Sequence, residues 1–227
     1  MPLPPGVHLL GPTIHCTVLQ ADQPGPTSLI QAGIHGDEVA GVHALQELLE
    51  EGFRPNRGRL LMIPVMNPPA YRERQRARTG GDDLNRCFPG DPDSTSREQR
   101  LAHRFMSLIL DERPALVATL HESKTRYSPE VHPSFGQTLV YGIKPCPPLL
   151  ERVVDELNGN LGRPDEVWAT HFFPVSTSST EVIVDTVGCV GTCVETWMGF
   201  PERRRIDMQK EVVRRLLAAA GNLDSPD

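Results

Sequence analysis

The sequence predicts an α/β fold in which the central strands of one sheet run parallel. Two apolar segments of strand length, residues 27–34 and 59–65, flank an amphipathic segment, residues 39–50, whose apolar side chains recur at helical spacing. A strand, a helix and another strand in succession place the two strands in parallel in one sheet. Residues 115–120 are almost continuously apolar, as expected of a central strand covered on both faces.

The same patterns predict the other elements. An edge strand is expected at residues 13–20, after which residues 21–26 form a turn, and further strands at 137–141, 181–187 and 191–194. Helices are expected at residues 94–110, 147–161 and 202–220. Residues 71–88 contain five arginines and few apolar side chains, and residues 124–135 are polar with two prolines, so both are predicted to be loops.

Composition narrows the class of protein. With 227 residues, 38% of them hydrophobic, the chain is expected to form one domain, residues 1–227. The formal charge of −6 gives no general attraction to nucleic acid or to anionic membranes. No apolar run approaches the ~20 residues that span a bilayer, and residues 1–6 do not resemble a signal peptide. The five cysteines include no C-x-x-C pair, which favours reduced thiols in a cytoplasmic protein.

Polar side chains follow three of the predicted strands. His35 and Glu38 come after the strand at 27–34, His121 after 115–120, and Glu195 after 191–194. Ligands of open α/β sheets collect at the carboxyl ends of strands. Imidazole nitrogens and carboxylate oxygens are zinc ligands, and a catalytic zinc typically has three of them plus water. Two histidines, one glutamate, a separate carboxylate base and an arginine make up the set needed for metal-assisted amide hydrolysis.

Each of these signals is weak when it stands alone. An H-x-x-E pair is more often not a metal site, and a histidine or glutamate at the end of a strand is more often packed or solvated. Residues 83–86, Asp-Leu-Asn-Arg, could be a turn with side-chain caps. The arginines of residues 71–88 could bind nucleic acid, although aromatic residues do not alternate with them. The functional interpretation therefore depends on all the parts occurring together and in order.

This ordered set resembles the zinc carboxypeptidase superfamily, including its succinylglutamate desuccinylase and aspartoacylase branch. The matching stretches are His35-Gly36-Asp37-Glu38, Asn67-Pro68, Arg78 seven residues before Asn85, the run Asp83-Leu84-Asn85-Arg86-Cys87-Phe88-Pro89-Gly90, Leu120-His121 and Val194-Glu195-Thr196. The resemblance implies a single domain with a mixed, mainly parallel sheet of about eight strands flanked by helices. It also implies one Zn²⁺ per chain, with His35, Glu38 and His121 as ligands.

The resemblance also implies the roles of the remaining residues. Glu195 would be the general base and acid, and Arg78 would polarise the scissile carbonyl. Asn85 and Arg86 would hold a substrate carboxylate. The implied reaction is cleavage of an amide bond next to that carboxylate in a small substrate, a short peptide or an N-acyl amino acid. Glu122, beside His121, is expected to support the site rather than to bind a second metal.

The chain departs from the family pattern in ways that leave the substrate open. No C-terminal β extension of the deacylase branch is recognised, and none of the three tyrosines aligns with the mobile tyrosine of the peptidase branch. The first departure favours a carboxypeptidase-like activity on peptides, whereas the amino-acid sequence of residues 83–90 favours an N-acyl-amino-acid deacylase. A binding protein that has lost catalysis on the same fold is the alternative from another class. Neither the acyl group nor the oligomeric state follows from the sequence.

Overall fold

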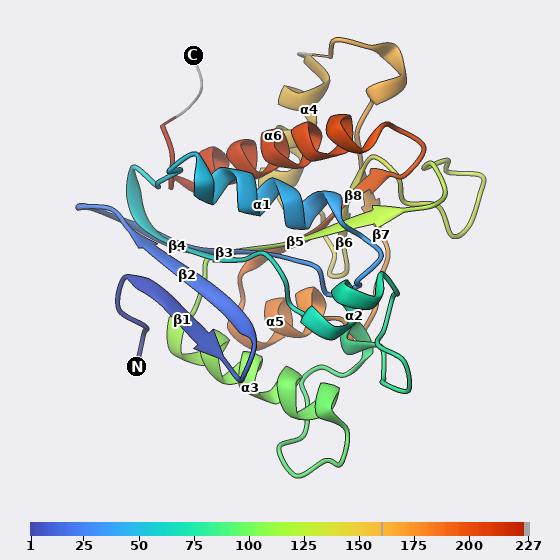
Figure 1. Ribbon diagram of the computed structural model, residues 1–227. Helices are drawn as coiled ribbons and strands as arrows, with labels where there is room; N and C mark the ends of the chain where they lie inside the picture. Colours follow the sequence, from blue (N-terminus) through green and yellow to red (C-terminus); the bar gives the residue numbers. More distant parts are fainter. Residues whose placement is uncertain (160, 225–227) are drawn as a thin grey trace.

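The computed structural model describes residues 1–159 and 161–224, and its centre is one sheet of eight strands (Figure 1). The strands are β1 (Gly6–Leu10), β2 (Ile14–Gln20), β3 (Gln23–Ala32), β4 (Arg57–Ile63), β5 (Leu116–Ser123), β6 (Thr138–Tyr141), β7 (Ala169–Phe172) and β8 (Val190–Trp197). Their order across the sheet is β1-β2-β4-β3-β5-β8-β6-β7. The predicted sheet of about eight strands is therefore confirmed.

The parallel part of the sheet is its centre. Strands β4, β3, β5 and β8 run parallel to one another, and β6 runs parallel to β7, whereas the pairs β1–β2, β2–β4 and β6–β8 are antiparallel. The sheet is therefore mixed, and the predicted parallel character holds for the central strands. The carboxyl ends of β3, β5 and β8 consequently meet at one edge of the sheet, which is where the polar clusters lie.

Helices cover both faces of the sheet (Figure 1). They are α1 (Ala40–Glu50), α2 (Pro68–Glu73), α3 (Arg97–Glu112), α4 (Pro148–Gly159), α5 (Ser179–Val187) and α6 (Glu202–Ala220), with short 3₁₀ segments η1 (Leu84–Arg86) and η2 (Pro164–Glu166). Helices α1, α4 and α6 pack on one face, where Leu45, Val153 and Val213 belong to one apolar core. Helices α3 and α5 pack on the other, where Phe105 and Ile183 belong to a second core. The central strands are therefore packed on both faces, and this packing holds their carboxyl ends in place.

One predicted strand is wrong, because residues 181–187 lie in helix α5. The run is β-branched, but Ser178 caps the helix by accepting a hydrogen bond from the backbone of Glu181. Gly188 ends the helix with φ 71°, a left-handed conformation that glycine adopts easily. Local capping has therefore overridden β propensity.

The sheet also has strands that the sequence patterns did not reveal. The segment at 13–20 is not an edge strand, because β1 pairs outside it, and β7 forms the opposite edge. Strand β3 begins at Gln23, within the predicted turn at 21–26. The predicted loop at 71–88 begins inside α2 and contains η1. These differences concern the periphery, and the predicted helices at 39–50, 94–110, 147–161 and 202–220 are confirmed to within a few residues.

Two further observations bear on the predicted environment of the chain. None of the helices in the described residues is long and apolar enough to cross a membrane. All five cysteines are free, as predicted from their spacing.

Candidate metal centre and active site

The loop after β3 holds His35 and Glu38 in place through a close backbone approach. The Gly36 amide donates a hydrogen bond of 2.9 Å to the carbonyl of Gln75. A Cβ atom at position 36 would lie 2.0 Å from the Ala70 carbonyl carbon, so only glycine fits there. The loop is therefore pressed against the end of α2, and His35 and Glu38 are both buried.

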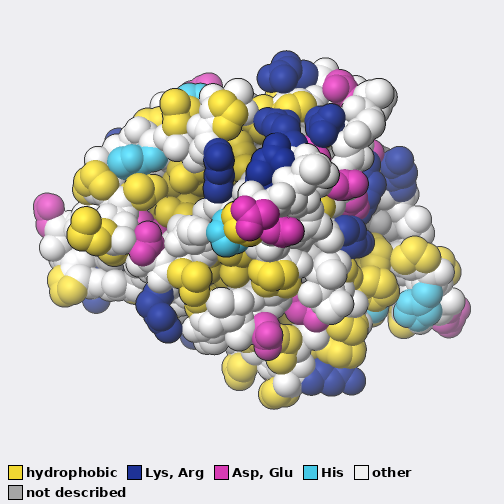
Figure 2. All heavy atoms as spheres, turned by 90° about the horizontal axis from the view of Figure 1, so that it is seen from below, with side chains coloured by type: hydrophobic (Ala, Val, Ile, Leu, Met, Phe, Trp, Pro, Cys, Tyr) yellow, Lys and Arg dark blue, Asp and Glu magenta, His cyan; other side chains and the backbone are white. Residues whose placement is uncertain are grey.

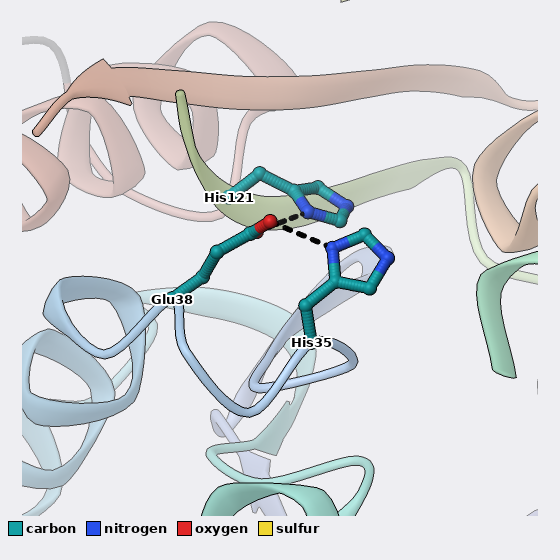
Figure 3. Close-up of side chains that lie close together, drawn as sticks. All are labelled: His35, Glu38 and His121. Carbon is teal, nitrogen blue, oxygen red and sulfur yellow. Dashed lines mark hydrogen bonds and ion pairs between the residues drawn. The ribbon is translucent and has the colours of Figure 1, made fainter. Parts of the chain in front are cut away.

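His35, Glu38 and His121 come together at the edge of the sheet (Figure 3). The Nδ1 atom of His35 lies 2.7 Å from Glu38 Oε1, and the Nδ1 atom of His121 lies 2.6 Å from Glu38 Oε2. One possible ligand atom from each residue lies within 4.8 Å of the others. Two imidazoles and a carboxylate in a buried cluster of this size fit the donor set of a zinc ion. The structure thus brings together the three residues that the sequence indicated.

Electrostatics show how strongly these groups interact. Burial is the largest single effect and by itself would lower the pKa of each histidine. Glu38, together with Asp83 at His35 and Cys193 at His121, outweighs burial and raises the pKa of both imidazoles. Burial would raise the pKa of Glu38, yet the two imidazoles hold it well below its usual range. Glu38 is therefore ionised and negative, as a metal ligand must be.

Two further carboxylates, those of Asp83 and Glu122, lie next to this cluster. Asp83 Oδ1 lies 3.3 Å from Nε2 of His35, the arrangement by which a carboxylate orients a metal-binding histidine. Glu122 is buried, accepts a 2.9 Å hydrogen bond from the Ala40 amide and pairs with Arg205. The Glu122 carboxylate is therefore engaged by α1 through Ala40 and by α6 through Arg205, and its supporting role stays a prediction.

Glu195 lies beside the cluster on the neighbouring strand. Position 195 of β8 pairs in register with His121 of β5. Burial is the main effect on its carboxyl group, and Glu38 acts in the same direction. Although the histidines oppose this, the pKa of Glu195 is raised to about 7. A carboxyl group with a pKa near neutrality can both accept and return a proton.

A cavity of about 490 Å³ opens over these residues. Six of the seven predicted site residues line it, namely His35, Glu38, Asn85, Arg86, His121 and Glu195. Its lining also includes apolar side chains, namely Phe135, Val140, Phe173 and Val175. This volume and this mixture of surfaces suit a small organic ligand.

Arg78 is the predicted site residue that does not line the cavity. Its Nε donates a 2.7 Å hydrogen bond to Glu98 Oε1, and Nη2 lies 3.3 Å from Oε2. Glu98 is only 2% exposed, so its carboxylate needs a positive partner, and Arg78 supplies it. Arg78 is therefore paired with Glu98 in this structure, and its role at the scissile bond stays a prediction.

Arg76 occupies the cavity wall instead and was not predicted. Its Nη1 lies 3.4 Å from His35 Nδ1, and Nη2 lies 2.8 Å from Asp83 Oδ2. The arginines of this loop alternate with other residues, so their spacing does not show which of them lines the cavity. The pairing of Arg76 with Asp83, seven residues later in the sequence, places Arg76 there, and no pattern in the sequence indicated that pairing.

Asn85 and Arg86 lie on the wall next to α5. The side-chain oxygen of buried Asn85 accepts a 2.9 Å hydrogen bond from the Ser179 amide. Its side-chain NH₂ is therefore the group left for a ligand. Arg86 is exposed and extends along the same wall. An amide donor next to a guanidinium can clamp a carboxylate.

Comparisons with known proteins show which family this chain resembles. Residues 24–129 match the family model of the succinylglutamate desuccinylase/aspartoacylase catalytic domain. That region contains His35, Glu38, Arg78, Asn85, Arg86 and His121. The resemblance to the zinc carboxypeptidase superfamily is confirmed. Glu195 lies beyond the matched region, and its predicted role is supported by its strand register and by its place in the cavity lining.

Individual relatives of this superfamily share parts of the sequence. An N-alpha-acetyl-L-2,4-diaminobutyric acid deacetylase of Halomonas elongata is 43% identical over 88 residues, which is 38% of this chain and 25% of that protein. A succinylglutamate desuccinylase of Yersinia pestis is 33% identical over 118 residues, 48% of this chain and 34% of that protein. The matches thus span a quarter to a third of the length of these relatives.

Solved structures of the superfamily share the fold over nearly the whole chain. A succinylglutamate desuccinylase from Silicibacter sp. is 26% identical with a TM-score of 0.71, covering 94% of this chain and 62% of its own. The tripeptide-bound cell shape determinant Csd4 from Helicobacter pylori is 18% identical with a TM-score of 0.82, covering 92% of this chain and 56% of its own. The latter likeness establishes the zinc carboxypeptidase-like fold and no more.

Proposed function

We propose that this protein is a zinc-dependent hydrolase that cleaves an amide bond next to a substrate carboxylate, with one zinc ion per chain. The observation that carries the proposal is the convergence of His35 and His121 on Glu38 at the floor of a cavity, with Glu195 beside them in register. No single residue would support this reaction, but the arrangement supplies a ligand set and a base in one place.

Each residue has a distinct part in this proposal. His35, Glu38 and His121 would hold the zinc ion, which would supply Lewis acidity toward a carbonyl and toward a water. Glu195 would accept a proton from the attacking water and return it to the leaving nitrogen, a role that its raised pKa favours. Asn85 and Arg86 bind the substrate carboxylate and so orient the scissile bond.

An arginine is needed where negative charge develops on the carbonyl oxygen. Arg78 is the residue that the family motif indicates, and in this role its guanidinium would leave Glu98 and turn toward the cavity. Arg76 already lines the cavity and lies 3.9 Å from Glu38 Oε1. Both arginines belong to the proposal, and variants of each separate their contributions.

Two classes of substrate fit the site. The open cavity and the fold shared with the tripeptide-bound Csd4 favour a carboxypeptidase-like activity on short peptides. The sequence relatives named as a deacetylase and a desuccinylase favour an N-acyl-amino-acid deacylase. Initial rates on a panel of short peptides and on acetyl and succinyl amino acids distinguish them. Turnover of the acyl amino acids alone would exclude the peptidase version.

Two other functions predict different results. A binding protein that has lost catalysis would show no zinc-dependent hydrolysis of any member of the panel. A nucleic-acid binder would use the arginines of residues 71–88, but Arg76 and Arg78 are paired with Asp83 and Glu98. Figure 2 shows acidic side chains next to the basic ones on the face seen from below. Absence of DNA or RNA binding at low salt would dismiss this function. The cytoplasmic location remains part of the proposal.

A further inference from the structure

We propose that Glu181 binds a positively charged group of the substrate, so that the enzyme prefers a residue whose alkyl side chain ends in an ammonium group. This inference rests on the proposed function and names the substrate class of the same cavity. Glu181 lies in the first turn of α5 and lines the same cavity as His35 and Glu38.

The start of α5 is held firmly next to the proposed carboxylate clamp. The amide of Ser179 donates to Asn85 Oδ1, and Thr180 Oγ1 lies 2.7 Å from Thr119 Oγ1 of β5. Thr119 stands two residues before His121 in that strand. Glu181 therefore has a fixed place relative to both the clamp and the metal cluster.

The carboxylate of Glu181 is fixed by a backbone contact. Oε2 accepts a hydrogen bond from the Val175 amide. A Cβ atom at position 142 would lie 2.3 Å from this same oxygen, so Gly142 leaves the space that the carboxylate occupies. The contact restricts the side chain to one orientation, in which Oε1 has no hydrogen-bond partner within residues 1–159 and 161–224. A carboxylate fixed in this way is preorganised for a cationic ligand.

Glu181 is not neutralised by the protein. The cationic residues lining the cavity are Arg76, Arg86 and Lys124, and none of them forms an ion pair with Glu181 among the described residues. Arg76 is paired with Asp83, and Lys124 lies 3.9 Å from Asp37. The negative charge on this wall therefore remains available to a ligand.

The surfaces next to Glu181 define the shape of the group that it would bind. Val140, Phe173 and Val175 line the same cavity and offer apolar contacts. A substrate held by its carboxylate at Asn85 and Arg86 can cover these side chains with methylene groups and place a terminal ammonium at Glu181. An alkyl chain with a charged end matches this surface better than a purely apolar or an acidic chain does.

Glu181 also has a structural role that the test must separate from binding. It stands three residues after the cap Ser178, and its contact with the Val175 amide closes the turn before the helix. Glu181→Gln keeps an oxygen that can accept from Val175 but removes the charge. Asp185→Asn is the matched control, because Asp185 lies on the same helix, is exposed and does not line the cavity.

The first measurement is kcat/KM of the zinc-loaded enzyme on pairs of N-acetyl amino acids of equal length. Each pair has an ammonium or a methyl group at the end of the side chain: 2,4-diaminobutyrate with norvaline, and ornithine with norleucine. The wild type is expected to prefer one of the ammonium substrates at least about tenfold. Glu181→Gln should abolish this preference while keeping turnover of the methyl substrates, and Asp185→Asn should leave both unchanged.

The second measurement does not need turnover. Calorimetric titration of the zinc-loaded protein with the free amino acids compares the ammonium and methyl members of each pair. Tighter binding of the ammonium member that is lost in Glu181→Gln supports the inference, whether or not any substrate is cleaved. Absence of cleavage would refute only the proposed hydrolase activity. The inference would be overturned if the ammonium and methyl members had equal kcat/KM and equal affinity. A preference for the ammonium member that persists in Glu181→Gln would also overturn it.

Discussion

His121 and Glu195 are paired residues of two adjacent parallel strands, β5 and β8. Their separation is set by the sheet, not by a loop. The proposed base is thereby held next to a proposed metal ligand on the most rigid part of the fold. Sites built on strands in this way are more precise than sites on mobile connections.

The first prediction concerns Glu195. Glu195→Gln should keep bound zinc but reduce kcat at least about a hundredfold, because the ligands remain while the proton acceptor is lost. Metal analysis and initial rates on the best substrate test this. The exposed Glu130→Gln, on the rim loop outside the cavity lining, serves as a control and should retain full activity. Near-normal turnover by Glu195→Gln would remove the residue from the proposed mechanism.

The proposed carboxylate clamp predicts a change in substrate use. Arg86→Ala should raise KM about 10- to 100-fold for substrates with a free carboxylate, since a charge-assisted pair contributes about 1.5–3 kcal/mol. The same substrates with an amide in place of the carboxylate should be affected far less. Arg72→Ala, an exposed arginine outside the cavity lining, is the control. Equal losses on both kinds of substrate would argue against a clamp.

The pairing of Arg78 with Glu98 predicts an effect on stability. Arg78→Ala should lower the free energy of unfolding by about 1–3 kcal/mol, because it leaves the buried Glu98 carboxylate without its partner. The double variant Arg78→Ala/Glu98→Gln should recover much of that loss. Urea unfolding measures both. If the double variant regains stability but not turnover, Arg78 also acts in the reaction, whereas unchanged stability of Arg78→Ala would contradict the pairing.

Acid stability should depend on a surface cluster that joins α1 to α6. Hydrogen bonds from Arg203 and Lys210 lower the pKa of Glu47 to about 2. An unfolded glutamate has a pKa of about 4.3, so this contribution is complete above that pH and is lost as the pH falls toward 2.

Glu47→Gln tests this pH dependence. The variant should be less stable than the wild type at pH 7, by under about 1 kcal/mol because the cluster is partly exposed, and the difference should shrink between pH 4 and pH 2. Urea midpoints at several pH values measure it. Glu50→Gln, exposed on the same helix, should show no such trend. A difference that grows on acidification would have the wrong sign for this account.

The central fold and the metal cluster could be predicted because their signals are local. The apolar run at 115–120 and the helical spacing at 39–50 each depend on burial of one kind of surface, and burial decides the structure there. The three residues of the cluster lie next to these elements in the sequence: His35 and Glu38 just before the helix, and His121 just after the apolar run. Parallel strands bring their carboxyl ends together, so the residues after them meet.

The parts that could not be predicted depend on contacts distant in the sequence. The sequence of α5 is rich in β-branched residues. Besides its local Ser178 cap, this helix is fixed by a hydrogen bond from the Ser179 amide to Asn85, which is 94 residues away. Strand β7, with half-buried residues, is defined by pairing with β6 more than by its own pattern. Arg78 is paired with Glu98, a residue outside the motif around Asn85. Each outcome is set by a tertiary partner that overrides local preference.

The most direct test of the central claim is the zinc content of the purified protein, measured together with its hydrolytic activity before and after chelation. The account predicts one zinc per chain in the wild type, loss of amide hydrolysis on its removal and recovery on its return. It also predicts a marked loss of bound zinc in His121→Ala but not in His15→Ala, a change at an exposed histidine outside the metal cluster. A wild-type protein without zinc affinity, or a His121→Ala variant with unchanged zinc content, would contradict it.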